Sequence, residues 1–175
     1  MKYFHILFAL ILFIIFSCED DKNTTQYDIN NEAEDYTIYQ IVLMDRYGET
    51  NYHILLNDLT GFSELDTFHI SNIKDKIDNI LDETIDNYLK ANFKSKKLKD
   101  IPGIDFYTFK SEYHGSYENT VEVYLSDVGY DNSMTQAILT LTESYNLGGG
   151  GMLIYLEKVG DKWMILYYYG LFIIG

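Results

Sequence analysis

The chain has 175 residues, of which 47% are hydrophobic and 23% are charged, and this composition indicates one folded domain rather than a disordered chain. Its net charge of -14 would repel a phosphate backbone, so binding to nucleic acid is not expected. The single cysteine, Cys18, cannot form a disulfide within the chain, so the folded part must depend on its hydrophobic core.

The first 17 residues have the features of a bacterial signal peptide. Lys2 precedes an unbroken apolar run, Ile6–Phe16, which is too short to span a bilayer as a helix. The run ends in IFSC at residues 15–18, which resembles the lipobox of bacterial lipoproteins. This resemblance implies cleavage before Cys18 and a diacylglyceryl group on its sulfur. Two or three acyl chains would hold the protein firmly, because each buried CH2 contributes roughly 0.8 kcal/mol. An ordinary signal peptide with an incidental cysteine is the alternative.

Residues 18–35 are expected to form a disordered acidic tether. Residues 19–35 contain seven acids and one lysine. The run EDDKN directly after Cys18 resembles the export signal of surface lipoproteins in Bacteroidetes-type bacteria. This resemblance implies display on the outer face of the outer membrane. A solvated linker without an address, with the protein on the periplasmic face, is the alternative. Residues 36–175 are then predicted to be one domain.

Two strands and one long helix are predicted after the tether. Residues 36–44 (YTIYQIVLM) and 52–57 (YHILLN) are rich in β-branched and aromatic residues, and we expect them to pair as a hairpin. Apolar residues then recur at helical spacing from Ser71, a plausible N-cap, to Phe93. The lysines at 90, 94, 96, 97 and 99 are interpreted as a solvated helix end, with contact to anionic lipid headgroups as the alternative.

Strands dominate the chain after its only proline, Pro102. They are expected at 106–109, 121–128, 137–143, 152–159 and 163–174, with Gly160 and Asp161 as the turn of a hairpin. The last strand, WMILYYYGLFII, is expected in the middle of the sheet because it would promote aggregation if exposed. The whole pattern predicts an α+β fold, in which one long amphipathic helix packs on a curved antiparallel β-sheet. Cystatin-like and nuclear-transport-factor-like cones are the analogies.

The C-terminal part has a pattern of its own. SDVGYDNSMTQA at 126–137 is followed by LGGGGM at 147–152 and KVGDKW at 158–163. Residues 106–175 resemble a set of bacterial lipoproteins and secreted proteins with the pattern Ser-x-Val-Gly-Phe/Tyr-Asn/Asp, Gln-Ala, a Gly-rich loop and Lys-x-x-Gly-x-Trp. The last part of the pattern stands here as Lys158, Gly160 and Trp163, with one residue between the lysine and the glycine and two between the glycine and the tryptophan. The resemblance implies a shared shape and no particular reaction. Gly129, Gly160 and Trp163 are interpreted as fold determinants.

The mature chain carries no recognised catalytic or metal-binding motif, so no cofactor and no metal are predicted. His53, His69 and His114 lack a metal-binding spacing. LGGGGM lacks the Lys-Ser/Thr and the helix of a phosphate-binding loop, so a flexible hairpin loop is expected there. Asp127 and Asp131 could form a carboxylate pair of the kind that hydrolases use, or could lie near each other by chance.

Three kinds of function remain open, and the first is favoured. The protein could be a non-enzymatic binding module for a protein or a glycan, with tyrosines lining a cleft: Tyr107, Tyr113, Tyr117, Tyr155, Tyr167, Tyr168 and Tyr169. It could be a hydrolase-like enzyme in which His114, Asp127 or Asp131 converge in a pocket of the sheet. It could also be an acidic inhibitor or immunity-type protein that masks a basic partner.

Overall fold

The structure of the protein is a computed structural model that describes residues 27–61, 65, 67–92, 95–115, 118–146 and 148–174. The chain forms two compact units, residues 1–34 and residues 35–175. The signal peptide expected at 1–17 and the lipid-attachment residue Cys18 lie outside the described residues, as does Tyr117.

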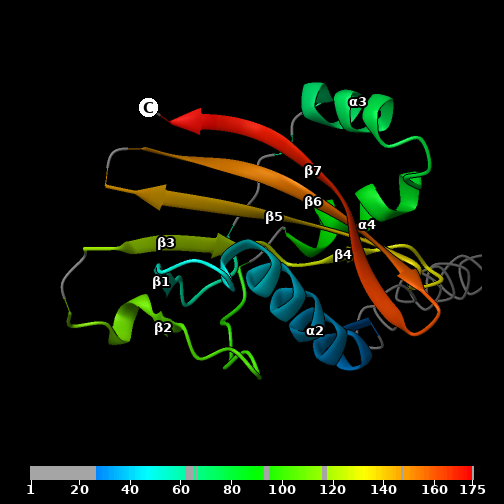
Figure 1. Cartoon of the computed structure of the whole chain (residues 1–175). Coiled ribbons are helices and arrows are strands. Elements are labelled where there is room, and N and C mark those ends of the chain that lie inside the picture. The colour runs from blue at the N-terminus through cyan, green and yellow to red at the C-terminus, as the bar shows by residue number, and fades with distance from the viewer. Residues whose placement is uncertain are drawn as a thin grey trace, which may run out of the picture. The chain divides into compact units, whose positions relative to one another are not determined.

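The α+β class is confirmed, because the described residues contain three α-helices and a seven-stranded mixed sheet that does not close (Figure 1). The helices are α2 (Tyr27–Tyr47), α3 (Thr67–Lys76) and α4 (Asp82–Ala91), with a short 3-10 helix, η1 (Lys110–Glu112). The strands are β1 (His53–Leu56), β2 (Tyr107–Phe109), β3 (Thr120–Leu125), β4 (Gly129–Tyr130), β5 (Gln136–Tyr145), β6 (Gly148–Val159) and β7 (Lys162–Ile174).

The sheet has the strand order β2-β1-β3-β5-β6-β7, with β4 paired to β5. It is mixed rather than antiparallel as expected, because β1 is parallel to both β2 and β3. The remaining pairs are antiparallel. Parallel neighbours need a long crossover connection, and residues 57–106, which include α3 and α4, provide it between β1 and β2.

The strand expected at residues 36–44 is wrong, because this segment lies in the middle of helix α2. The buried residues of α2 form one helical face, because each has another buried residue three to five positions away: Ile38, Tyr39, Val42, Leu43 and Tyr47. Burial of that face outweighs the strand preference of its β-branched residues. The helix also begins at Tyr27, inside the segment 18–35 that was expected to be a disordered tether.

One long helix at 71–93 is not observed, because residues 77–81 separate α3 from α4. Ser71 therefore lies inside α3 rather than at its N-cap. The side chain of Gln136 stabilises the break by accepting a hydrogen bond from the backbone N–H of Leu81 (2.9 Å) and donating one to the carbonyl of Asn79 (2.6 Å). These bonds replace helical hydrogen bonds that the broken segment lacks.

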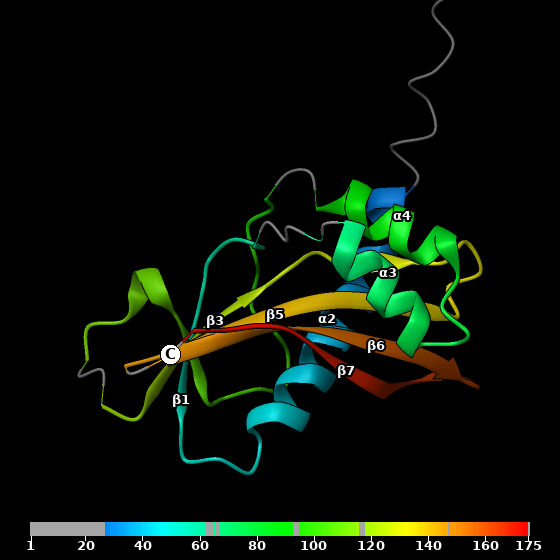
Figure 2. The same ribbon diagram turned by 90° about the horizontal axis from the view of Figure 1, so that it is seen from above.

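The two faces of the sheet carry different helices (Figure 2). Residues 35–47 of α2 pack on one face, where the larger core includes Tyr39, Leu43, Leu141 and Ile154. Helices α3 and α4 cover the other face, where a second core includes Ile73, Tyr88, Ile138 and Tyr155. Alternate residues of β5 and β6 therefore enter different cores, which is why consecutive residues are buried in the middle of both strands.

The final hairpin forms as predicted, with Val159 opposite Lys162 and Gly160 in the left-handed region at φ +63°. Two expectations about this region are wrong. The glycines at 148–151 belong to β6 and pair with β5, so they form a strand rather than a loop. Within the part of the chain that the structure describes, strand β7 pairs only with β6 and lies at an edge of the sheet rather than in its middle.

Candidate functional site

An open hollow of about 480 Å³ lies where β5, β6 and β7 meet at the glycine-rich end of the sheet. Ten residues of these three strands line it: Glu143, Tyr145, Gly148, Gly149, Gly150, Gly151, Met152, Gly170, Phe172 and Ile173. Glycine backbone and apolar side chains form most of this surface, with one carboxylate and one phenol among them. Few polar groups on an apolar, concave surface are typical of a binding site.

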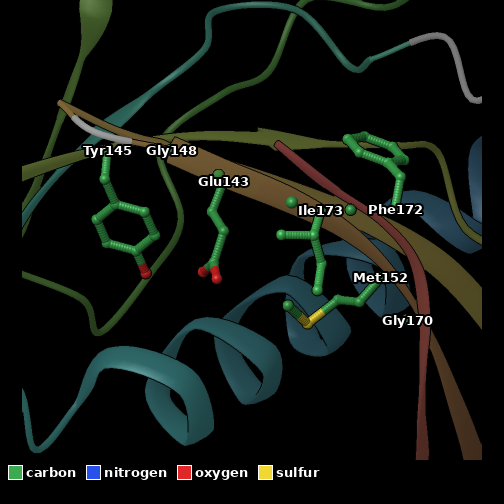
Figure 3. A pocket seen from close by; sticks show the side chains of 10 residues that line it. Glu143, Tyr145, Gly148, Met152, Gly170, Phe172 and Ile173 are labelled. Atoms are coloured by element: carbon green, nitrogen blue, oxygen red, sulfur yellow. The ribbon is translucent and has the colours of Figure 1, made fainter. Parts of the chain in front are cut away.

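The hollow opens on the face of the sheet that carries α2 (Figure 3). The side chains of Glu143, Tyr145 and Ile173 point toward this helix, whereas Phe172 points to the opposite face. The strand register agrees with this view, because Glu143 lies opposite Gly150, and Gly150 lies opposite Ile173. Directly opposed residues share one face of a sheet. The absence of a side chain at Gly150 therefore leaves space between Glu143 and Ile173.

Glu143 is a buried carboxylate held by the last turn of α2. Its oxygens accept hydrogen bonds from Nη2 (2.6 Å) and Nε (3.3 Å) of Arg46 and from the hydroxyl of Tyr47 (2.7 Å). Burial alone would raise the pKa of Glu143, but the Arg46 and Tyr47 hydrogen bonds outweigh it and lower the pKa below its ordinary value. Burial, together with the neighbouring carboxylate, raises the pKa of Tyr47. Glu143 is therefore ionised at neutral pH and paired, which suits positioning more than proton transfer.

The glycines that line the hollow differ in how much space a side chain would have at each position. A Cβ at Gly150 would lie 2.9 Å from the carbonyl oxygen of Phe172, and one at Gly149 would lie 3.1 Å from Cα of Ser144. These glycines are needed for the close approach of neighbouring strands. A Cβ at Gly170 would meet nothing within 4 Å. Gly170 is thus a place where the hollow can be filled without displacing the backbone.

Aromatic side chains flank the hollow. Tyr145 meets Tyr52 edge to face, with ring centroids 5.7 Å apart. On β7, the hydroxyl of Tyr168 donates a hydrogen bond to Asp45 near the end of α2. Ile173, which also lines the hollow, is 92% exposed. A large exposed aliphatic side chain beside tyrosines offers a surface that an apolar ligand would cover.

The motif SDVGYD at 126–131 has structural roles. The side chain of Asp131 is buried and accepts four hydrogen bonds within the following turn, including those from the backbone N–H groups of Thr135 and Gln136 (both 2.6 Å). The hydroxyl of Ser126 accepts a bond from the N–H of Thr140 (2.7 Å), and the carbonyl of Ser126 accepts one from Tyr39 (3.0 Å). These contacts join α2, β3 and β5, so the motif stabilises the packing of these elements.

Gly129 and Trp163 both lie at closely packed positions of the folded unit. A Cβ at Gly129 would lie within 2.5 Å of the backbone nitrogen of Tyr88, so α4 can pack on β4 only over a glycine. Trp163 is nearly buried, with its ring 5.8 Å from that of Tyr130 and with the Lys158 ammonium 5.3 Å from its centroid.

The residues of the hydrolase hypothesis have other partners. Asp127 is buried and lies 3.2 Å from the ammonium of Lys96, and Asp131 closes its turn. His114 is exposed in the segment between η1 and β3. His53 bonds the hydroxyl of Thr108 (2.9 Å), and His69 lies 3.4 Å from the carbonyl of Leu171. Within the described ranges, no group of three or more His, Cys, Asp or Glu side chains could hold a metal ion.

The described tyrosines among those predicted to line a cleft do not line the hollow. Tyr155 is buried, the hydroxyl of Tyr107 accepts a bond from the N–H of Ile101 (2.8 Å), and Tyr113 stacks on His53 at 5.7 Å. Tyr169 packs against the α3/α4 core, while Tyr167 and Tyr168 are exposed on β7. The tyrosine that does line the hollow, Tyr145, was not among the predicted residues.

Sequence reasoning also missed the Arg46–Glu143 pair. The signals were present, because Arg46 is the only arginine of the chain and Glu143 interrupts the apolar and threonine-rich run of β5. Their separation of 97 residues and the misassigned strand at 36–44 hid the contact.

No family model, no curated protein and no solved structure matches the chain. None of the helices in the described part of the chain is both long and apolar enough to cross a membrane.

Proposed function

We propose that the protein is a lipid-anchored, non-enzymatic binding module whose ligand occupies the hollow at the end of β5, β6 and β7. The observation that carries the proposal is the hollow itself, which has a volume of about 480 Å³ and a mostly apolar lining. The lining includes the paired carboxylate of Glu143, the ring of Tyr145 and the highly exposed Ile173. An exposed apolar surface beside a concavity is a frequent mark of a binding site.

Contacts around Glu143 favour binding over catalysis. A general acid or base needs a carboxyl that changes its protonation state near neutral pH. Glu143 has a lowered pKa and is bonded to Arg46 and Tyr47. The Arg46 guanidinium is part-exposed beside it. This pair fixes the end of α2 against β5 and shapes one wall of the hollow, so the hollow keeps its form in the absence of a ligand.

The ligand that this surface fits best is an apolar segment of a polypeptide. The lining offers Met152, Ile173 and the Tyr145 ring, and bare glycine backbone lets another main chain approach closely. A glycan is the second candidate, because Tyr52 and Tyr145 could stack on a sugar ring. Either ligand would bind without a cofactor.

A substitution that fills the hollow tests this proposal. Peptide and glycan libraries are selected for binding to the full-length protein, and the selected ligands are measured against Gly170→Leu and against Val159→Leu. A side chain at Gly170 of β7 would extend into open space in the hollow. Val159 is also exposed, but it lies at the end of β6 that is remote from the hollow. We expect Gly170→Leu to weaken binding at least about tenfold, or about 1.4 kcal/mol, and Val159→Leu to leave it unchanged. Equal affinity for both variants would refute the hollow as the binding site.

The anchor is a separate part of the proposal. The lipobox-like sequence at 15–18 and the acidic residues after it support attachment through Cys18 to the outer membrane, with the folded unit on the cell surface. Cells that express the protein are labelled with palmitate, and intact cells are treated with protease. We expect label on the wild type, no label on Cys18→Ala, and digestion of the wild type from outside. Label that persists in Cys18→Ala contradicts the anchor, while protection from protease would place the protein on the periplasmic face.

A further inference from the structure

Strand β7 is a long edge strand that lacks the charged residues and proline that usually protect an edge, although His69 of α3 lies 3.4 Å from the carbonyl oxygen of Leu171 near its C-terminal end. Its residues 163–174 contain no Asp, Glu, Lys, Arg or Pro. Large apolar side chains are exposed along it: Met164, Leu166, Tyr167, Tyr168, Phe172 and Ile173. Soluble proteins normally place charges or proline on such an edge, because its unpaired N–H and C=O groups can accept another strand. The opposite edge, β2, has only three residues.

Charge favours a second copy of this chain as the occupant of that edge. The protein has a net charge of -14, so two copies repel one another wherever their acids face each other. Residues 163–174 bring no charge of their own to such a contact, and the carboxylate of Asp45 beside them accepts a hydrogen bond from the hydroxyl of Tyr168. A charged peptide would gain no charge complementarity from residues 163–174.

The side chains of β7 outside the hollow supply part of the area that a dimer needs. The exposed fractions of Met164, Leu166, Tyr167 and Tyr168 together equal almost two fully exposed side chains, or roughly 350 Å² at about 200 Å² each. A standard interface buries about 800 Å² on each partner. The main chain of the edge strand would contribute to the rest.

Two bulges in β7 are compatible with pairing of identical strands. The register with β6 shifts at Leu166 and at Leu171, so β7 bends on either side of its middle residue, Tyr168. A twofold axis near Tyr168, perpendicular to the sheet, places each bulge of one copy beside a bulge of the other. Both strands then bend at the same places, which an unrelated straight strand would not do.

We propose that β7 pairs antiparallel with β7 of a second copy, about a twofold axis near Tyr168, to form one continuous sheet through both copies. Such a contact is isologous and closes after two copies. Strand addition takes place in the plane of the sheet, so the hollow on the α2 face stays open. The inference does not depend on the proposed ligand.

Cysteine cross-linking in cells tests the register. Single cysteines are introduced into the full-length protein at Leu166, Tyr168 and Phe172, and at Val159 as an exposed control outside the edge strand. Residues near a twofold axis lie next to their own copies, so Tyr168→Cys should give the most disulfide-linked dimer and Val159→Cys should give none. Equal cross-linking at Val159, none at position 168, or more cross-linking at position 172 than at position 168, would overturn the proposal.

Sedimentation of the purified, detergent-solubilised protein tests the affinity independently. The wild type should be dimeric. Leu166→Lys and Tyr168→Lys bring like charges together across the axis, so each should weaken dimerisation at least about tenfold, whereas Val159→Lys should not. Circular dichroism confirms that each variant is folded. A wild type that is monomeric, or that forms open-ended polymers, would refute a closed dimer.

Discussion

Replacement of Gly129 by alanine should severely destabilise the folded unit. Gly129 lies in β4 under helix α4, and its φ is not in the left-handed region, so alanine can adopt its backbone conformation. The cost arises from packing. The new Cβ would lie within 2.5 Å of the Tyr88 backbone nitrogen, where ordinary contact begins at 3.4 Å. Because the overlap involves backbone, no rotamer change relieves it, and α4 must move away by about 1 Å.

That movement has a cost of about 4 kcal/mol. Overpacking of a core position costs typically about 1–3 kcal/mol. The shift also strains two buried hydrogen bonds, one between the hydroxyls of Tyr88 and Thr140 (3.0 Å) and one from the side-chain amide of Asn92 to the carbonyl of Asp127 (3.0 Å). Each bond contributes about 1 kcal/mol. For a urea dependence of about 2 kcal/mol per molar, the unfolding midpoint should fall by about 2 M.

Urea unfolding followed by circular dichroism measures this midpoint. Gly170→Ala is the matched control, because it is also a strand glycine but its Cβ meets nothing within 4 Å. It should change the free energy of unfolding by no more than about 0.5 kcal/mol. If Gly129→Ala and Gly170→Ala unfold at the same urea concentration, the close packing of α4 on β4 is wrong.

Two further predictions concern polar groups. Gln136→Ala should cost about 2–3 kcal/mol and speed hydrogen exchange at residues 79–84, because the N–H of Leu81 and the hydroxyl of Thr84 lose their acceptor. Gln136→Glu keeps that acceptor and should exchange more slowly than Gln136→Ala; the reverse order would contradict the role of Gln136. Glu143→Gln should destabilise the protein most at neutral pH. The folded pKa of Glu143 is lowered, so its ionised form stabilises the fold above the unfolded value of about 4.3, and this contribution disappears as pH falls through the folded pKa. Urea midpoints of the two proteins should therefore converge in acid, and a gap that widens there would exclude the ion pair as its cause.

Local sequence patterns predicted most strands but not their arrangement. The strands at 52–57, 106–109, 137–143 and 163–174 correspond to β1, β2, β5 and β7, because β-branched and aromatic residues suit a pleated surface. The same residue types at 36–44 form part of α2, since burial of one helical face against the sheet decides the outcome there. The parallel pairing of β1 depends on partners far along the chain, which no local pattern reveals.

Prediction of the site failed for a related reason. The hollow depends on the register that sets Glu143 opposite Gly150, and on α2 bringing Arg46 to the carboxylate. Neither relation is visible without the sheet order. The four glycines at 148–151 have the composition of a flexible loop, which is why the sequence predicts a loop there. In the structure they form part of β6 and allow close packing of neighbouring strands.

Hydrogen exchange of the full-length protein with and without its selected ligand tests the central claim most directly. If the ligand occupies the hollow, slower exchange should be confined to two separate segments, residues 143–152 of β5 and β6 and residues 168–174 of β7, because both line it. Protection at residues 126–136 or along the lysines at 96–99, with these two segments unchanged, would place binding elsewhere and contradict the account.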